Sequence, residues 1–261
     1  MRTSPDDLVL GVLDQSPIPS GSTAPDALRN TLELARAADR LGYARYWVAQ
    51  HDEFSRQLEE LIALLSNHRA ETRIRAIPDP GPGRMPELWL LGSSDYGALC
   101  AAQFGTAFSF AHFINPGLGP AVARAYRDRF RPSPRLAAPR VGVGVGVICA
   151  DDEAEARRLA QSVGLWRLRL ERGDPGPVPS VEEAESHPYS DAERARLSHS
   201  SRRLVVGAPE QVRAALLAVA SEYRADELAL LTLVHDPAAR LRSYELVAEA
   251  FALSGAPTAR R

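Results

Sequence analysis

The stretch VGVGVGVICADDEAEARRLAQSVGLWRLRL, residues 141–170, decides the fold. Its first ten residues are apolar or glycine throughout, which is typical of a strand buried on both faces. Two aspartates follow, and from Glu153 to Leu170 apolar residues recur every three or four positions, as on one face of a helix. A buried strand followed by an amphipathic helix predicts one β/α unit of a parallel sheet.

The same alternation runs along the whole chain. About six apolar strands are expected, with amphipathic helices between them, whereas a closed (β/α)₈ barrel needs eight strands. The pattern therefore predicts an α/β fold with a parallel sheet, in a single domain over residues 1–261, and both a barrel and a doubly wound sheet fit it. A polar, proline-rich excursion is expected over residues 173–203. The expected strands cover residues 8–13, 46–49, 88–92, 106–114, 141–150 and 226–234.

Composition excludes several classes of function. The 261 residues are 45% hydrophobic and carry a net charge of −2, without a basic stripe, so we expect no nucleic-acid partner. The apolar run at residues 8–13 is too short for a signal peptide or a membrane span. Cys100 and Cys149 lie in apolar segments without metal-ligand spacing. We expect a cytoplasmic protein with free thiols, no metal and no membrane partner.

Several segments carry a resemblance to a known family. They are LVLGVLDQSPIPSGSTAPDALRNTLELARAADRLGYARYWVAQH at residues 8–51, EFSRQLEELIALL at 53–65, PELWLLGSSDYGALCAAQFG at 86–105 and VVGAPEQVRAALLAV at 205–219. Together they resemble the bacterial luciferase-like, flavin-dependent monooxygenases, and within them the group found beside natural-product gene clusters. In that family a long segment separates the histidine after strand two from the following helix. Here His51 is joined through Asp52 almost directly to a helix expected over Ser55–Asn67. The resemblance therefore implies an internal deletion of about two β/α units and an α/β fold derived from a TIM barrel, incomplete, with about six parallel strands.

The resemblance implies a monooxygenase or oxidoreductase that uses reduced FMN on a small organic or natural-product substrate. In the family, strand three supports the isoalloxazine ring and strand four carries an arginine for the flavin phosphate, and this chain lacks both. Two alternatives therefore stay open. One is a cofactor-free tailoring enzyme, a cyclase or isomerase, on a truncated barrel. The other is a non-catalytic protein that binds flavin or another ligand.

Three residues are candidates for acid–base chemistry. By resemblance, His51 matches the family histidine that acts beside the flavin, and a histidine suits this role because its pKa lies near neutrality. His112 and Asp14 end two other expected strands, and strand ends on one rim of a barrel converge. The alternatives are an idle loop histidine at position 51 and a structural histidine at position 112.

The stretch GSSDYG, residues 92–97, is a turn from strand to helix. The first backbone N–H groups of a helix form an anion site, which Ser93 and Ser94 would extend with their hydroxyls. The resemblance implies contact with the flavin phosphate here, while an ordinary helix N-cap is the alternative. The candidate cofactor-binding residues are Gly92, Ser93, Ser94, Tyr96 and Gly97.

A substrate pocket is expected at the same rim. The alternating glycines of the strand at residues 141–150 leave one face without side chains, where a flat ligand could lie unless neighbouring elements fill the space. Tryptophans are more often core residues than cofactor contacts. The candidate pocket residues are Gln15, Ser16, Trp47, Gly144, Gly146 and His235.

The deletion also predicts an assembly. Without strands three and four, the edges of the second and third remaining strands are exposed unless they meet each other, and unpaired edges invite association. We expect a homodimer whose interface lies near residues 47–65.

Overall fold

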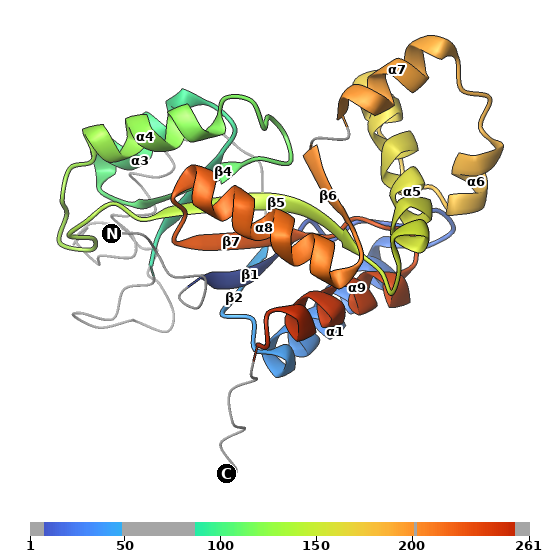
Figure 1. Ribbon diagram of the computed structural model, residues 1–261, viewed down its shortest axis with the longest axis horizontal. Helices are drawn as coiled ribbons and strands as arrows, with labels where there is room; N and C mark the ends of the chain where they lie inside the picture. The colour runs from blue at the N-terminus through green and yellow to red at the C-terminus, as the bar shows by residue number, and fades with distance from the viewer. Residues whose placement is uncertain (1–7, 49–86, 201–202, 254–261) are drawn as a thin grey trace, which may run out of the picture.

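The computed structural model describes residues 8–48, 87–200 and 203–253, and in this part of the chain a seven-stranded parallel sheet carries the fold (Figure 1). Six strands form a continuous path in the order β2-β1-β7-β5-β4-β3, and β6 pairs with the carboxyl half of β5. The strands are β1 (Val9–Asp14), β2 (Arg45–Val48), β3 (Trp89–Gly92), β4 (Ala107–Ala111), β5 (Val141–Cys149), β6 (Leu204–Gly207) and β7 (Glu227–Leu231).

Eight helices of the described residues connect or cover these strands. The first begins after Thr23, whose side chain caps it by accepting a hydrogen bond from the Asp26 N–H, and it ends at Gly42 in the left-handed conformation. α5, α6 and α7 gather at the carboxyl end of β5, to the right in Figure 1. The helices are α1 (Ala24–Leu41), α3 (Asp95–Phe104), α4 (Gly119–Arg129), α5 (Glu153–Glu171), α6 (Val181–Ser186), α7 (Asp191–Ser200), α8 (Pro209–Tyr223) and α9 (Pro237–Ala250).

Strand alternation divides the core into two clusters. On β5 the valines 141, 143, 145 and 147 face outward, where they pack with residues of α1, α3, α4, α8 and α9. The inner cluster contains Leu13, Phe113 and Leu231 from the ends of three strands together with residues of α5 and α6. α5 and α6 therefore lie over the inner face of the sheet, at its carboxyl end.

The inner face of β5 is filled by side chains of the protein. A Cβ at Gly142 would lie 2.9 Å from the Trp89 ring, and one at Gly144 would lie 3.0 Å from Phe113. A Cβ at Gly146 would lie 2.6 Å from Leu204. Of the two interpretations open for these glycines, the structure supports filling by neighbouring elements, and the space that Gly144 and Gly146 leave is not open to a ligand.

The two ends of the curled sheet approach each other. The rings of Trp47 on β2 and Trp89 on β3 lie 5.4 Å apart, edge to face, and Arg45 forms a 2.6 Å ion pair with Glu87. The homodimer was expected on condition that these edges did not meet. Their contact weakens that reasoning, and the homodimer stays a prediction.

The predicted fold class, an incomplete barrel built on about six parallel strands, is confirmed. β6 is a short seventh strand that the sequence analysis did not identify. The segment expected as an excursion, residues 173–203, contains α6 and α7. The helix expected over Ser55–Asn67 lies outside the described residues, as does most of the predicted dimer interface.

Candidate functional site

Asp14, a predicted catalytic residue, is locked in a buried ion pair. One carboxylate oxygen accepts hydrogen bonds from the Arg240 guanidinium at 2.6 Å and from the Ser16 N–H at 2.7 Å. The other accepts a hydrogen bond from the Tyr46 hydroxyl at 2.6 Å. Burial raises the pKa of Asp14, but the Arg240 charge and the hydrogen bonds from Tyr46 and Arg240 outweigh it, so the pKa lies below its ordinary value. A carboxylate so engaged is a poor proton acceptor, and its geometry indicates a structural role.

His112, the second predicted catalytic residue in the described part, points into the helix layer. It is 8% exposed, and its Nδ1 lies 2.9 Å from the hydroxyl of Tyr223 on α8. Tyr223 also packs against Phe110, which belongs to the outer cluster. His112 therefore has the environment of a structural histidine, which is the alternative that the sequence left open. His51 lies outside the described residues.

The turn after β3 keeps the features of an anion site. Ser94 is the N-cap of α3 with an extended backbone, but its side chain makes no capping hydrogen bond, and it is exposed. Tyr96 is 56% exposed on the first turn of α3, while Gly97 is buried near Gly92. The hydroxyl of Ser94 and the first N–H groups of α3 are thus available to a phosphate.

The remaining predicted pocket residues each contact other parts of the protein. Gln15 is half-buried, and the Ser16 hydroxyl accepts a hydrogen bond from Thr31 at 2.9 Å. His235 reaches the backbone oxygen of Ser20 at 3.2 Å. Trp47 lies inside the curled sheet against Trp89, as part of the core.

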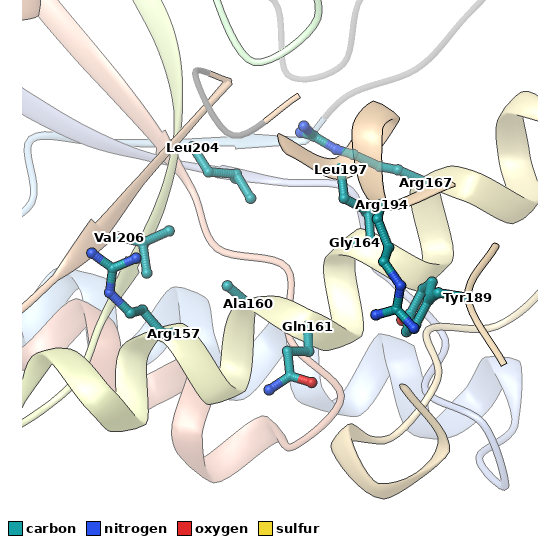
Figure 2. A pocket seen from close by; sticks show the side chains of 10 residues that line it. All are labelled: Arg157, Ala160, Gln161, Gly164, Arg167, Tyr189, Arg194, Leu197, Leu204 and Val206. Atoms are coloured by element: carbon teal, nitrogen blue, oxygen red, sulfur yellow. The ribbon is translucent and has the colours of Figure 1, made fainter. Parts of the chain in front are cut away.

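A pocket that the sequence analysis missed lies between α5, α7 and β6 (Figure 2). Its volume is about 510 Å³, within the range of small-molecule sites. We call it the basic pocket. Its polar lining comes from Arg157, Gln161, Arg167, Tyr189 and Arg194, and its apolar lining from Ala160, Gly164, Leu197, Leu204 and Val206.

Helical spacing explains why the α5 residues share one wall. The α5 positions 157, 160, 161, 164 and 167 are three or four apart and lie on one face of the helix. Arg157 lines the pocket from a largely exposed position, with 72% of its side chain accessible, and pairs with Glu153 at 2.5 Å. Its neighbour Arg158 is also exposed and pairs with Glu155 at 2.8 Å.

Arg167 is the most constrained cation of the basic pocket. Its Nη2 donates a hydrogen bond to the backbone oxygen of Phe113 at 3.2 Å, just past the carboxyl end of β4. Its Nη1 is buried and has no hydrogen-bond partner. Burial, with the charge of Arg203, lowers the pKa of Arg167 to about 10, so the side chain is still charged at neutral pH.

Within residues 8–48, 87–200 and 203–253, no cluster of three or more histidine, cysteine, aspartate or glutamate side chains is placed to hold a metal ion. None of the helices there is long and apolar enough to cross a membrane.

Comparison with known proteins places this geometry in a family. Residues 53–226 match the family model described as luciferase-like monooxygenase. The protein YwcH of Bacillus subtilis is 32% identical, with 93% of this chain and 99% of YwcH covered. A luciferase-like monooxygenase of Escherichia coli is 26% identical over 92% of this chain and 96% of its own.

Two comparisons bear on the shape and length of the chain. The crystal structure of apo-MsnO8 superposes with a TM-score of 0.84 at 29% identity, over 96% of this chain and 99% of that chain. The monooxygenase RslO1 of Streptomyces bottropensis, at 15% identity and a TM-score of 0.62 over 93% and 98% of the two chains, shares the fold. The alignment with YwcH extends over 330 positions, 69 more than the 261 residues of this chain, which supports a missing segment.

Proposed function

Because this chain belongs to the luciferase-like monooxygenase family, we propose that it is a flavin-dependent monooxygenase that uses reduced FMN on a small organic substrate. The observation that carries the proposal is the family match over residues 53–226, together with relatives described as monooxygenases that align over nearly the whole chain. The N-acetyl-S-alkylcysteine monooxygenase of Bacillus subtilis is one such relative, 23% identical over 92% of this chain and 97% of its own.

The turn after β3 fits one part of the cofactor. The first N–H groups of α3 and the hydroxyl of Ser94 are hydrogen-bond donors that suit a phosphate. Asp95 is the one carboxylate on the first turn of this helix. Ser93 and Ser94 would hold the phosphate of FMN. When bound, the reduced flavin supplies the electrons with which oxygen is activated. The residues of the chain would orient the flavin and exclude water from it.

The filled interior limits where the ring of the flavin can lie. Trp47, Trp89 and Phe113 occupy the inner face of the sheet, so a planar ligand has to lie above the strand ends. This rim is where barrel enzymes bind their ligands. His51, which directly follows the second strand in the sequence, would be the acid–base group on this rim by resemblance.

Titration with FMN tests the proposal. The wild type should quench the fluorescence of added FMN, and the variant Ser93→Ala/Ser94→Ala should bind it about ten- to a hundred-fold more weakly, because a lost charge-assisted contact costs about 1.5–3 kcal/mol. Ser221→Ala, at an exposed position on α8, is the matched control and should change nothing. Oxygen consumption with reduced FMN should fall in His51→Ala.

The result also separates the alternatives. A wild type that binds neither oxidised nor reduced FMN at millimolar concentration would overturn the proposal and leave the cofactor-free enzyme or a binding protein. Tight FMN binding that is unchanged in the serine variant would overturn the placement of the phosphate alone.

A further inference from the structure

We propose that the basic pocket holds the anionic group of the organic substrate, whose apolar rings lie against β6. The identification of the ligand as the substrate rests on the proposed function, whereas the pocket itself is defined by its geometry. The predicted ligand class is a molecule with a fused-ring or similarly bulky apolar skeleton and one carboxylate, sulfonate or phosphate.

The first argument is the pairing of the arginines on α5. Arg157, Arg158 and Arg169 each form an ion pair with a glutamate, at 2.5, 2.8 and 2.7 Å respectively. Arg167 forms none with any residue that the structure describes, although it is the most buried of the four. The helix thus keeps one guanidinium outside an ion pair, with Glu171 acting on its charge from a distance, and the side chain of this arginine lines the basic pocket (Figure 2).

The second argument is the unsatisfied donor. A guanidinium has five N–H groups in a rigid fork, which matches the two oxygens of a carboxylate. Phe113 fixes the fork from one side through Nη2 and leaves the buried Nη1 without a partner. Leaving a buried polar group without a partner is costly, so an anion that moves the covering side chains far enough to accept from Nη1 would recover part of that cost.

A second cation lies on the opposite wall. Arg194 of α7 lies over the ring of Tyr189 at 5.8 Å, a contact that leaves its N–H groups available to a ligand. Arg194 has no carboxylate partner within the described ranges. Figure 2 shows the guanidinium of Arg194 beside Tyr189, at the other end of the basic pocket from that of Arg167, so Arg194 adds positive potential to the pocket and not a second direct bond to the same anion.

The apolar lining of the pocket would contact the apolar skeleton of the ligand. Leu204 and Val206 project from β6, and Leu197 closes the space over Gly164, where an added Cβ would lie 3.0 Å from it. A ring system of two or three fused rings fits within about 510 Å³. The bond from Arg167 to Phe113 places this pocket beside the carboxyl end of β4, on the rim where a barrel enzyme binds its ligands.

Calorimetric titration without flavin tests the inference with a matched pair of probes, 2-naphthoate and the neutral 2-naphthamide. The wild type should bind naphthoate at least about ten-fold more tightly than naphthamide, since each charge-assisted bond contributes about 1.5–3 kcal/mol. Arg167→Gln and Arg194→Gln should each reduce that preference, and Arg167→Gln should abolish it. Arg158→Gln removes the same charge from α5 outside the pocket and should retain the full preference.

Three results would overturn the inference. They are failure of naphthoate to bind at millimolar concentration, equal binding of naphthoate and naphthamide, and an unchanged preference in both Arg167→Gln and Arg194→Gln. The phosphate of FMN is the other source of the same chemistry. If Arg167→Gln weakens FMN but not riboflavin, while the serine variant leaves FMN unaffected, the pocket serves the cofactor and the assignment to substrate is wrong. Because the naphthoate titration contains no flavin, it succeeds or fails independently of the FMN titration.

Discussion

Replacing Asp14 with alanine should unfold the protein more readily rather than disable its chemistry. The Asp14 side chain is fully buried, and the substitution removes the acceptor of hydrogen bonds from Arg240, Tyr46 and the Ser16 backbone. Arg240 would remain buried at 5% exposure, with its charge uncompensated except for a bond from Nε to the backbone oxygen of Thr232. Breaking a buried ion pair by removing one partner costs about 3–5 kcal/mol.

That cost is a large part of the stability of any domain, which is about 5–15 kcal/mol. With a urea dependence of about 3 kcal/mol per molar, the unfolding midpoint of Asp14→Ala should fall by roughly 1–2 M. The assay is urea unfolding followed by far-ultraviolet circular dichroism. Asp39→Ala, at an exposed position on α1, is the control and should shift the free energy of unfolding by less than about 0.5 kcal/mol.

A double variant sharpens the test. Asp14→Leu/Arg240→Met removes both charges, so it should recover most of the stability lost in Asp14→Ala. The lowered pKa of Asp14 adds a pH dependence, because the ionised form stabilises the fold above the ordinary value near 3.8 and this contribution is lost as the pH falls through the lower folded value. If Asp14→Ala unfolds within about 1 kcal/mol of the wild type yet loses turnover, the structural assignment is wrong and Asp14 is catalytic.

Two other predictions concern the core and the excursion. Gly142→Ala should destabilise the protein by about 1–3 kcal/mol and shift tryptophan emission, because the new Cβ would lie 2.9 Å from Trp89. Gly176→Ala is the control and should have neither effect, because the space around Gly176 is open. An unshifted emission in Gly142→Ala would contradict the packing of Trp89 against β5. Hydrogen bonds from Ser190, with support from His187 and Arg172, lower the pKa of Glu193 to about 2, so α7 should lose protection from hydrogen exchange as the pH falls from about 4.5 toward 2. Glu193→Gln should remove that pH dependence and the exposed Glu185→Gln should keep it, whereas equal protection at pH 4.5 and pH 2 in the wild type would refute the assignment.

The sequence carried enough information for the sheet and its helices. Continuous apolar runs and helix caps such as Thr23 and Gly42 are local signals, because each depends on a few neighbouring residues. β6 was not predicted, because a strand of four residues after a polar helix is too short to show a hydrophobic pattern. Its neighbour β5 is long enough to pair with β4 along its first half and with β6 along its second, which is a tertiary fact.

The direction of the strand-end residues was also available but was not used. Asp14 continues the alternation of Leu10 and Val12, and His112 continues that of Phe108 and Phe110. These partners pack in the outer cluster, so alternation places both polar residues in the helix layer. Convergence of strand ends was a correct argument about position, but it says nothing about which side of the sheet a side chain takes.

The basic pocket could not be predicted because it depends on an approach between distant elements. Arg167 and Arg194 are 27 positions apart, and only the return of the chain through α6 and α7 brings them to one hollow. In the sequence each is one arginine among 31 basic residues, with nothing to mark it as unpaired. Charge becomes informative here only when the structure shows which arginines have a glutamate and which do not.

The shortened sheet and the position of the pocket are physically connected. A six-strand path that curls until Trp47 meets Trp89 encloses a narrow space, and the alternating glycines of β5 give that space to Trp89, Phe113 and Leu204. In the function that we propose, a ligand would therefore lie above the carboxyl ends of the strands and not between them. Two sets of available donors lie there within the described residues, the turn after β3 and the basic pocket beside β4 and β6. Because β4 lies between β3 and β5 in the sheet, one turn and one pocket flank a common strand, an arrangement that suits a cofactor phosphate on one side and an anionic substrate on the other.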